Sequence, residues 1–187
     1  MKMRNFLCLL VLLVMVPVSA GALEDIPGVG LGEAIPHSLQ LLDQNKEEQN
    51  FGALAGEKGT VLFFVRSADW CPFCKSQLID LGEKGGLIEG LGYSVVTLSY
   101  DDPKILKVFS DKYKFPYTML SDPESEAIKA FGVLNEEMKP MTRYYGVPYP
   151  VVYVVGLDKT IKARIAEEDY KNRPSVAQIT EAINALN

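Results

Sequence analysis

Asp69-Trp70-Cys71-Pro72-Phe73-Cys74-Lys75 is the stretch that decides the fold, because it places two cysteines between two contrasting runs of sequence. The run before it, 60–66, is short, apolar and rich in β-branched and aromatic residues, which is typical of a buried strand. The run after it has apolar residues on one side of a helix, at Leu78, Ile79 and Leu81. We therefore expect a strand, a short connection that carries both cysteines, and then a helix.

The start of a helix is a favourable place for a reactive sulfur. Its backbone N–H groups are free and its dipole is positive there, so both stabilise a thiolate, which is the nucleophilic form of cysteine. Cys71 and Cys74 are three positions apart and so share one helical face, as closing a disulfide requires. Pro72 has no N–H to lose in the first helical turn and stiffens the connection. The pattern predicts a redox-active dithiol.

The first 22 residues have the pattern of a signal peptide. Lys2 and Arg4 form a basic start, 6–18 is apolar, and 19–22 offers small residues for cleavage. An apolar run of about thirteen residues is shorter than the roughly twenty that a membrane helix needs. We expect the leader to be removed, leaving a domain over 23–187 that is periplasmic or secreted and not inserted in a membrane. A retained N-terminal anchor is the alternative.

Leader removal changes the cysteine count. Cys8 lies within the leader, so Cys71 and Cys74 are the two cysteines expected in the mature chain. One closely spaced pair is not a disulfide scaffold, and its small loop adds little stability. Zinc needs four ligands and His37 is the single histidine, so we expect no metal and no cofactor. The net charge is −5 with no basic stripe, which argues against nucleic acid as a partner.

The rest of the chain alternates between strand and helix patterns. This order predicts an α/β fold, a central mixed sheet with helices on both faces. The lead-in over 23–58 holds at most a short strand or hairpin, and 133–149 is irregular. Further strands are expected at 93–100, 115–120, 151–155 and 160–165, a short helical piece near Leu87, and helices after Pro103, Pro123 and Pro174.

The strand, the Trp-Cys-x-x-Cys element and the helix together resemble the thioredoxin superfamily. The wider frame resembles its peroxiredoxin-like branch, which includes alkyl hydroperoxide reductase C and the thiol-specific antioxidant proteins. The residues that carry this resemblance are 66–70, 99–101, 120–123 and the strand at 150–155. It covers roughly 24–187 and implies a thioredoxin fold and thiol-based redox chemistry.

The resemblance also implies a proline, usually in the cis form, beside the cysteines. Pro150 fits this place better than Pro148, and in the cis form it would leave the preceding backbone free to pair with a bound substrate segment. Peroxiredoxins carry a threonine three residues before the peroxidatic cysteine and a proline seven before. If Cys74 takes the peroxidatic place, Cys71 and Ser67 stand there instead. An arginine that holds the peroxide is expected in the family about where Pro150 stands.

Without that arginine, two candidates are open. Arg66 and Arg143 could substitute for it, but the sequence puts neither at the sulfurs. Proteins of the thioredoxin type commonly bury an acidic residue in the strand, six residues before the first cysteine. Val65 stands at that position here, and the nearby Asp69 is expected to be partly solvated. Asp101 and Asp102 are interpreted as a turn and helix cap rather than as a functional site.

These departures favour dithiol–disulfide exchange over peroxide reduction. In that hypothesis Cys71 is the exposed, attacking thiolate and the more buried Cys74 resolves the mixed disulfide. Reactive cysteines in such motifs have pKa values of about 3.5–7.5, and we expect the pKa here to lie in the upper part of that range. Trp70 either covers the sulfurs or packs in the core. The partners are a protein thiol or disulfide and an external electron donor. The alternatives are a thiol-dependent peroxidase acting on hydrogen peroxide or organic hydroperoxides and, less favoured, a non-enzymatic copper-handling or binding module.

Overall fold

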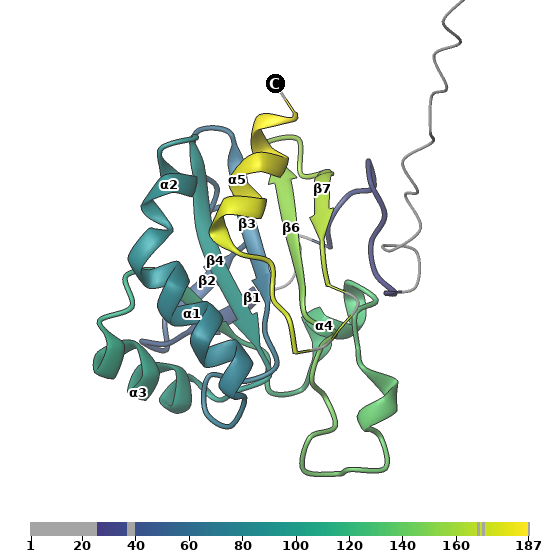
Figure 1. The fold of residues 1–187 in the computed structure, drawn as a ribbon. Coiled ribbons are helices and arrows are strands. Elements are labelled where there is room, and N and C mark those ends of the chain that lie inside the picture. The colour runs from purple at the N-terminus through teal and green to yellow at the C-terminus, as the bar shows by residue number, and fades with distance from the viewer. Residues whose placement is uncertain (1–25, 37–39, 168, 170, 187) are drawn as a thin grey trace, which may run out of the picture.

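The computed structural model describes residues 26–36, 40–167, 169 and 171–186, which form one seven-stranded sheet (Figure 1). The strand order is β2-β1-β5-β4-β3-β6-β7. Strands β3, β4 and β5 run parallel, and the other neighbours pair antiparallel. The strands are β1 (Gln40–Asp43), β2 (Glu48–Asn50), β3 (Gly59–Phe64), β4 (Tyr93–Ser99), β5 (Thr118–Ser121), β6 (Val151–Gly156) and β7 (Ile161–Ile165).

Strand β3 lies inside the sheet, between β4 and β6, and every one of its residues is buried. Because neighbouring side chains on a strand point to opposite faces of the sheet, β3 contributes side chains to two hydrophobic cores. Val61 and Phe63 belong to the first core, and Leu62 and Phe64 to the second. The continuous apolar run at 60–66, which predicted a buried strand, thus serves both faces of the sheet.

Helices cover the two faces unequally. The first core packs against α1, α2, α3 and α5, whereas the second packs against α4 and the loops around Ile35 and Phe51. Figure 1 shows α1, α2 and α5 in front of the sheet and α4 behind it. The helices are α1 (Pro72–Lys84), α2 (Gly86–Glu89), α3 (Pro103–Tyr113), α4 (Glu126–Ala130) and α5 (Val176–Asn184), with a short 3₁₀ helix at Glu136–Met138. The predicted α/β mixed sheet with helices on both faces is confirmed.

The predicted elements agree closely with this structure. The lead-in holds a hairpin, β1–β2, and β1 joins the sheet beside β5. The segment 133–149 is irregular apart from the 3₁₀ turn. Gly59 fits the start of β3 because a Cβ there would lie 1.9 Å from the carbonyl oxygen of Val155.

The predicted leader over 1–22 and His37 lie outside the described residues. Within the part that is described, no helix is both long and apolar enough to cross a membrane.

Candidate active site

The two cysteines occupy the N-terminus of α1, as predicted. Cys71 is the N-cap residue, and its Sγ accepts a hydrogen bond from the backbone N–H of Cys74 at 3.3 Å. Pro72 is the first residue of the helix. The sulfur of Cys71 therefore does what a serine or aspartate side chain does at an ordinary helix start, and it is held close to Cys74.

Both cysteines are free thiols and both are buried. Cys71 is 2% exposed and Cys74 is 0% exposed. The expectation that Cys71 is the exposed sulfur of the pair is therefore wrong for this structure, whereas Cys74 is the more buried of the two, as expected. Cys71 turns inward because its sulfur caps α1 and belongs to the same apolar cluster as Cys74.

An arginine from the far end of the chain lies against the sulfurs. Nη2 of Arg173 is 3.6 Å from Sγ of Cys74 and 3.9 Å from Sγ of Cys71. Arg173 lies on the segment between β7 and α5, and the Pro174 carbonyl there accepts a hydrogen bond from Gln77 of α1. Figure 1 shows this yellow segment returning beside α1. The helix start and the C-terminal segment together give the dithiol a positive environment.

This environment separates the pKa values of the two cysteines. A hydrogen bond from the Cys71 side chain lowers the pKa of Cys74 to about 5, with Arg173 and the backbone of Ser67 adding to the effect against burial. The hydrogen bond with Cys74 and burial raise the pKa of Cys71. The lower pKa thus belongs to Cys74 and not to Cys71, the cysteine that the sequence favoured as the attacking thiolate.

A buried carboxylate fixes the loop that leads to the cysteines. Asp101 is 4% exposed and follows β4. It accepts hydrogen bonds from Oγ of Ser67 at 2.8 Å, the N–H of Ala68 at 2.7 Å and Oγ of Ser99 at 3.0 Å. Burial raises its pKa, which these hydrogen bonds oppose. Asp102 is the N-cap residue of α3, as the sequence indicated, whereas the Asp101 side chain binds the 67–68 loop instead of acting in the turn and cap.

Ser67 passes this restraint on toward the helix. Its Oγ accepts hydrogen bonds from the N–H groups of Asp69 at 3.0 Å and Trp70 at 3.3 Å. Its own backbone is one of the groups that lower the pKa of Cys74. The residue that stands where the resemblance expected proline therefore organises the loop through its hydroxyl group. Asp69 is exposed, as expected.

Trp70 packs in an aromatic group beside this loop. Its ring lies 4.5 Å from the ring of Tyr144, and its Nε1 donates to the hydroxyl of Tyr100 at 2.8 Å. The guanidinium of Arg66 lies 5.2 Å from the Trp70 ring centroid, and Arg143 stacks on Tyr144. Both of these arginines thus lie against aromatic rings, whereas Arg173 is an arginine that contacts the sulfurs.

The expected cis proline is absent. No peptide bond among the described residues is cis, and this includes those before Pro148 and Pro150. The backbone just before β6 is paired in an extended form. The N–H of Asn135 donates to the Val147 carbonyl at 2.9 Å, and the N–H of Tyr149 donates to the Val133 carbonyl at 2.7 Å. This pairing takes up backbone groups that a bound substrate segment was expected to use.

The sequence led us to expect no metal site. Within the described ranges, no group of three or more His, Cys, Asp or Glu side chains has the arrangement to hold a metal ion. Methionine sulfur is a soft ligand of the kind that a copper site would use, but two of the methionines have other surroundings. Met119 is fully buried in the first core, and Sδ of Met138 lies 3.4 Å from Nη2 of Arg66.

Sequence reasoning located the cysteines, Trp70 and Pro72 but missed Arg173 and the role of Asp101. Arg173 is about a hundred residues from the cysteines and follows no motif. A signal did exist for Asp101, since it closely follows β4, a strand that runs parallel to and beside β3. The carboxyl ends of neighbouring parallel strands meet at one edge of a sheet.

The fold and the buried dithiol define a thioredoxin-fold thiol protein. The family model described as the AhpC/TSA family matches residues 31–164, and the chain belongs to this family. The chain is 34% identical over 104 residues to Peroxiredoxin bcp1 of Schizosaccharomyces pombe, which covers 56% of this chain and 52% of that protein. It is 28% identical over 133 residues to a putative peroxiredoxin bcp of Haemophilus influenzae, covering 71% and 83%. The alignment thus spans about half the length of the first relative.

Solved structures show the same fold. Peroxidoxin BcpB of Mycobacterium tuberculosis superposes with a TM-score of 0.70 at 21% identity, covering 84% of this chain and 96% of that one. A mutant of Peroxiredoxin 6 of Arenicola marina superposes with a TM-score of 0.74 at 22% identity, covering 85% and 74%. At these identities the likeness supports the thioredoxin-type fold, in agreement with the predicted architecture.

Proposed function

We propose that the protein is a thiol-dependent peroxidase in which Cys74 is the peroxidatic residue. The Cys74 thiolate attacks one oxygen of a hydroperoxide, the O–O bond breaks, and the other oxygen leaves as an alcohol or water after taking up a proton. Cys74 becomes a sulfenic acid. Because Arg173 is 3.6 Å from the Cys74 sulfur, it can also stabilise negative charge that develops on the leaving oxygen.

Cys71 completes the cycle as the resolving thiol. Its sulfur attacks the sulfur of the Cys74 sulfenic acid, the S–O bond breaks, and water leaves as the Cys71–Cys74 disulfide forms. An external thiol then reduces this disulfide to two thiols by two successive exchanges. Capping of α1 by the Cys71 sulfur keeps it near Cys74, so resolution requires little rearrangement.

The pairing of Cys74 with Arg173 is the observation that carries this proposal. Arg173 favours the thiolate form of Cys74, the cysteine that stands in the peroxidatic place of the family. Arg173 also supplies an arginine at the sulfurs, which the sequence did not show near Pro150. Both findings favour peroxide reduction over the dithiol–disulfide exchange that the sequence pattern favoured. Membership in the AhpC/TSA family supports the same choice.

A stoichiometric titration tests the proposal. The reduced wild-type protein is mixed with one equivalent of hydrogen peroxide or cumene hydroperoxide, and free thiols are counted with time. We expect fast loss of two thiols in the wild type and of one in Cys71→Ser, where the sulfenic acid persists. Thiol loss in the wild type no faster than in Cys74→Ser would refute peroxidase activity.

Dithiol–disulfide exchange with proteins remains the second candidate, because Phe73 between the cysteines is 37% exposed and offers a partner an apolar contact. Reduction of insulin disulfides distinguishes the two activities. Rapid insulin reduction by the wild type, lost in both single cysteine variants and accompanied by slow peroxide reaction, would favour exchange.

Export remains part of the proposal, and the signal-peptide pattern over 1–22 supports it. We propose that the mature chain works in the periplasm or outside the cell, where an external electron donor recycles it. N-terminal sequencing of the protein recovered outside the cytoplasm tests this. A start at Gly21 or Leu23 is expected, and an intact leader would contradict cleavage.

A further inference from the structure

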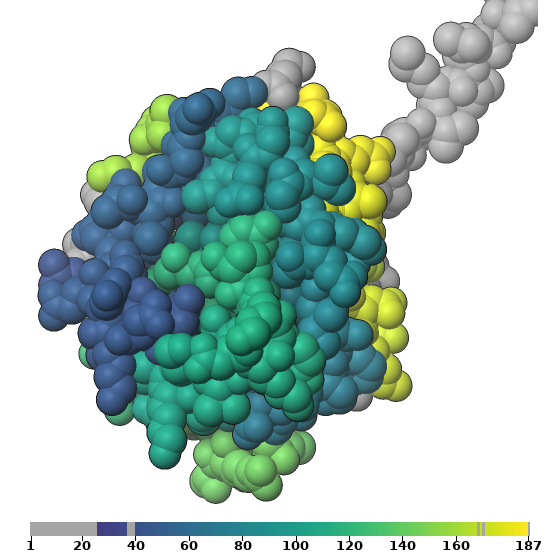
Figure 2. Space-filling view, turned by 90° about the vertical axis from the view of Figure 1, so that its left-hand side faces the viewer, coloured from purple at the N-terminus to yellow at the C-terminus, as the bar shows by residue number. Residues whose placement is uncertain are grey.

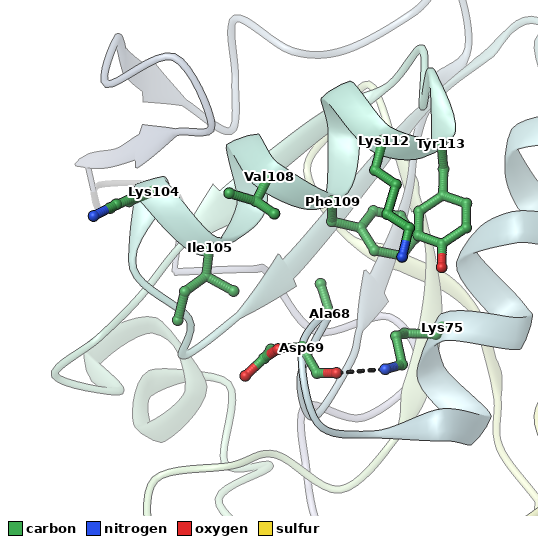
Figure 3. Close-up of a pocket in the computed structure, with 9 residues that line it drawn as sticks. All are labelled: Ala68, Asp69, Lys75, Lys104, Ile105, Val108, Phe109, Lys112 and Tyr113. Carbon is green, nitrogen blue, oxygen red and sulfur yellow. Dashed lines mark hydrogen bonds between the residues drawn. The ribbon is translucent and has the colours of Figure 1, made fainter.

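A groove runs along α3 beside the loop that carries the cysteines. Its volume is about 410 Å³. One wall is formed by Ala68, Asp69 and Lys75, and the other by residues of α3 (Figure 3). Asp69 is two residues before Cys71, and Lys75 is next to Cys74. The groove thus shares with the dithiol the loop before α1 and the first turn of that helix, although the two sulfurs do not line it.

The groove carries positive charge although the chain is acidic overall. Lys75, Lys104 and Lys112 line it together with a single carboxylate, Asp69, whereas the whole chain has a net charge of −5. Nζ of Lys75 is occupied by the carbonyl oxygen of Asp69 at 2.6 Å. Among the residues that the structure describes, neither Lys104 nor Lys112 forms an ion pair with a carboxylate. No carboxylate thus neutralises either of these two ammonium groups in the described structure, although Nζ of Lys112 also lies 5.1 Å from the ring centroid of Tyr113.

Between these lysines the surface is apolar and exposed. Val108, between Lys104 and Lys112, is 62% exposed, and Tyr113, beyond Lys112, is 39% exposed (Figure 3). Figure 3 shows Ile105 and Val108 between Lys104 at one end of the groove and Lys112 toward the other. A ligand that fits this surface has an apolar centre and an acidic group at each end.

The length of the groove decides what kind of ligand fits. Lys104 and Lys112 are eight residues apart on α3, which is about 12 Å along a helix. A small anion would contact one of them at a time. An extended peptide advances about 3.3 Å per residue, so acidic side chains about four residues apart would reach both.

We propose that this groove binds an acidic, apolar-centred segment of the protein that reduces the Cys71–Cys74 disulfide. The inference rests on the proposed function, because the disulfide forms in that cycle. Docking here brings the reductant's thiolate to the dithiol. That thiolate attacks one sulfur of the disulfide and releases the other as a thiolate. A second thiol of the reductant then attacks the mixed disulfide, which leaves Cys71 and Cys74 reduced and the reductant oxidised.

A cysteine-containing peptide tests the groove directly. The probe is a synthetic peptide with one cysteine and two glutamates about four positions apart, with leucines between them. Its control has glutamines in place of the glutamates. We expect the acidic peptide to reduce the oxidised wild-type protein at least about tenfold faster than the neutral one, with the advantage lost at high salt.

Two double variants locate the effect. Lys104→Glu with Lys112→Glu reverses the groove charge and should abolish the advantage of the acidic peptide. Lys58→Glu with Lys162→Glu makes the same change in net charge at the opposite end of β3, and should leave the advantage intact. Dithiothreitol should reduce all three proteins at equal rates.

The outcomes separate this inference from the proposed function. If the acidic peptide gains no advantage in the wild type, or keeps it in the groove variant, the docking inference is overturned. The rate at which peroxide oxidises reduced Cys74, measured in the same proteins, should be the same in the wild type and in both double variants. If peroxide does not oxidise Cys74 in the wild type, the proposed peroxidase function is refuted, whatever the peptides do. A fatty carboxylate that binds the groove more tightly than the peptide would also overturn the inference, since the ligand would then be a small amphiphile.

Discussion

The N-termini of α1 and α3 lie at the same edge of the sheet and differ in what stands at the cap. Each helix follows one of two adjacent parallel strands and has proline in its first turn. At α1 the cap is Cys71, whose sulfur accepts a helix N–H. At α3 the cap is Asp102, whose side chain makes no capping bond. The comparison teaches that a helix start does not make a site by itself.

What distinguishes α1 is its surroundings. Arg173 lies over the sulfurs, and Asp101 fixes the loop that leads into the helix. Asp101 comes from the connection that enters α3, so the second βα unit supports the first. The reactivity of Cys74 is therefore expected to depend on groups outside its own helix, and the substitutions below test that dependence.

Replacing the nucleophile should have the largest effect. Cys74→Ser removes the thiolate, and we expect the rate of peroxide reduction to fall by roughly three orders of magnitude or more. Stopped-flow peroxide consumption measures this. Cys71→Ser is the matched control, because serine is a favoured N-cap residue and should preserve the helix start. If Cys74→Ser retained fast oxidation at Cys71, the assignment of roles would be reversed.

Removing the charge over the sulfurs should come next. In Arg173→Gln the Cys74 thiolate loses an opposite charge, which typically shifts a pKa by about 1–3 units. The pKa of Cys74 should rise from about 5. Because the thiolate reacts, the rate falls as pH drops below the pKa, and the variant should lose activity at a higher pH than the wild type. Arg143→Gln, which removes a charge from the aromatic group instead, should leave the pH profile unchanged.

Loosening the loop should have a smaller effect on chemistry. The Asp101 carboxylate accepts hydrogen bonds from the Ser67 hydroxyl and the Ala68 N–H. Asp101→Asn replaces one of its two oxygens with an NH₂ donor, so one of these two buried donors loses its acceptor. We expect a loss of about 1–3 kcal/mol in the free energy of unfolding, measured by urea denaturation, and a rise in the Cys74 pKa. Unchanged stability together with an unchanged pKa would show that Asp101 does not hold the loop.

Changing the other cap should have the smallest effect. Asp102→Ala removes a side chain without a capping bond, so the unfolding free energy should change by less than about 0.5 kcal/mol. A loss near the 1 kcal/mol typical of a working cap would mean that α1 and α3 begin alike, and would weaken the contrast between them.

The sequence was sufficient for the parts of the site that are local. The apolar run at 60–66, the spacing of Cys71 and Cys74 and the position of Pro72 predicted the strand, the helix start and the dithiol. The same kind of local pattern predicted the remaining helices and strands, because each element buries one face at a regular period.

The sequence was insufficient where tertiary packing decides. Arg173 reaches Cys74 because the segment before α5 crosses the end of α1, which no spacing encodes. Which cysteine is the thiolate also depends on this contact and on the inward turn of the Cys71 sulfur. The backbone before Pro150 is paired with 133–135 rather than available to a substrate, and that pairing lies within a segment that the sequence showed only as irregular.

The pH dependence of alkylation at each cysteine tests the central claim most directly. Reduced wild-type protein is treated briefly with iodoacetamide across a range of pH, and the modification of each cysteine is resolved by fragment-ion mass spectrometry. We predict that alkylation of Cys74 rises with a midpoint near pH 5, while Cys71 stays unmodified until well above its ordinary pKa. A low midpoint at Cys71, with Cys74 unreactive at neutral pH, would contradict the assignment of Cys74 as the nucleophile.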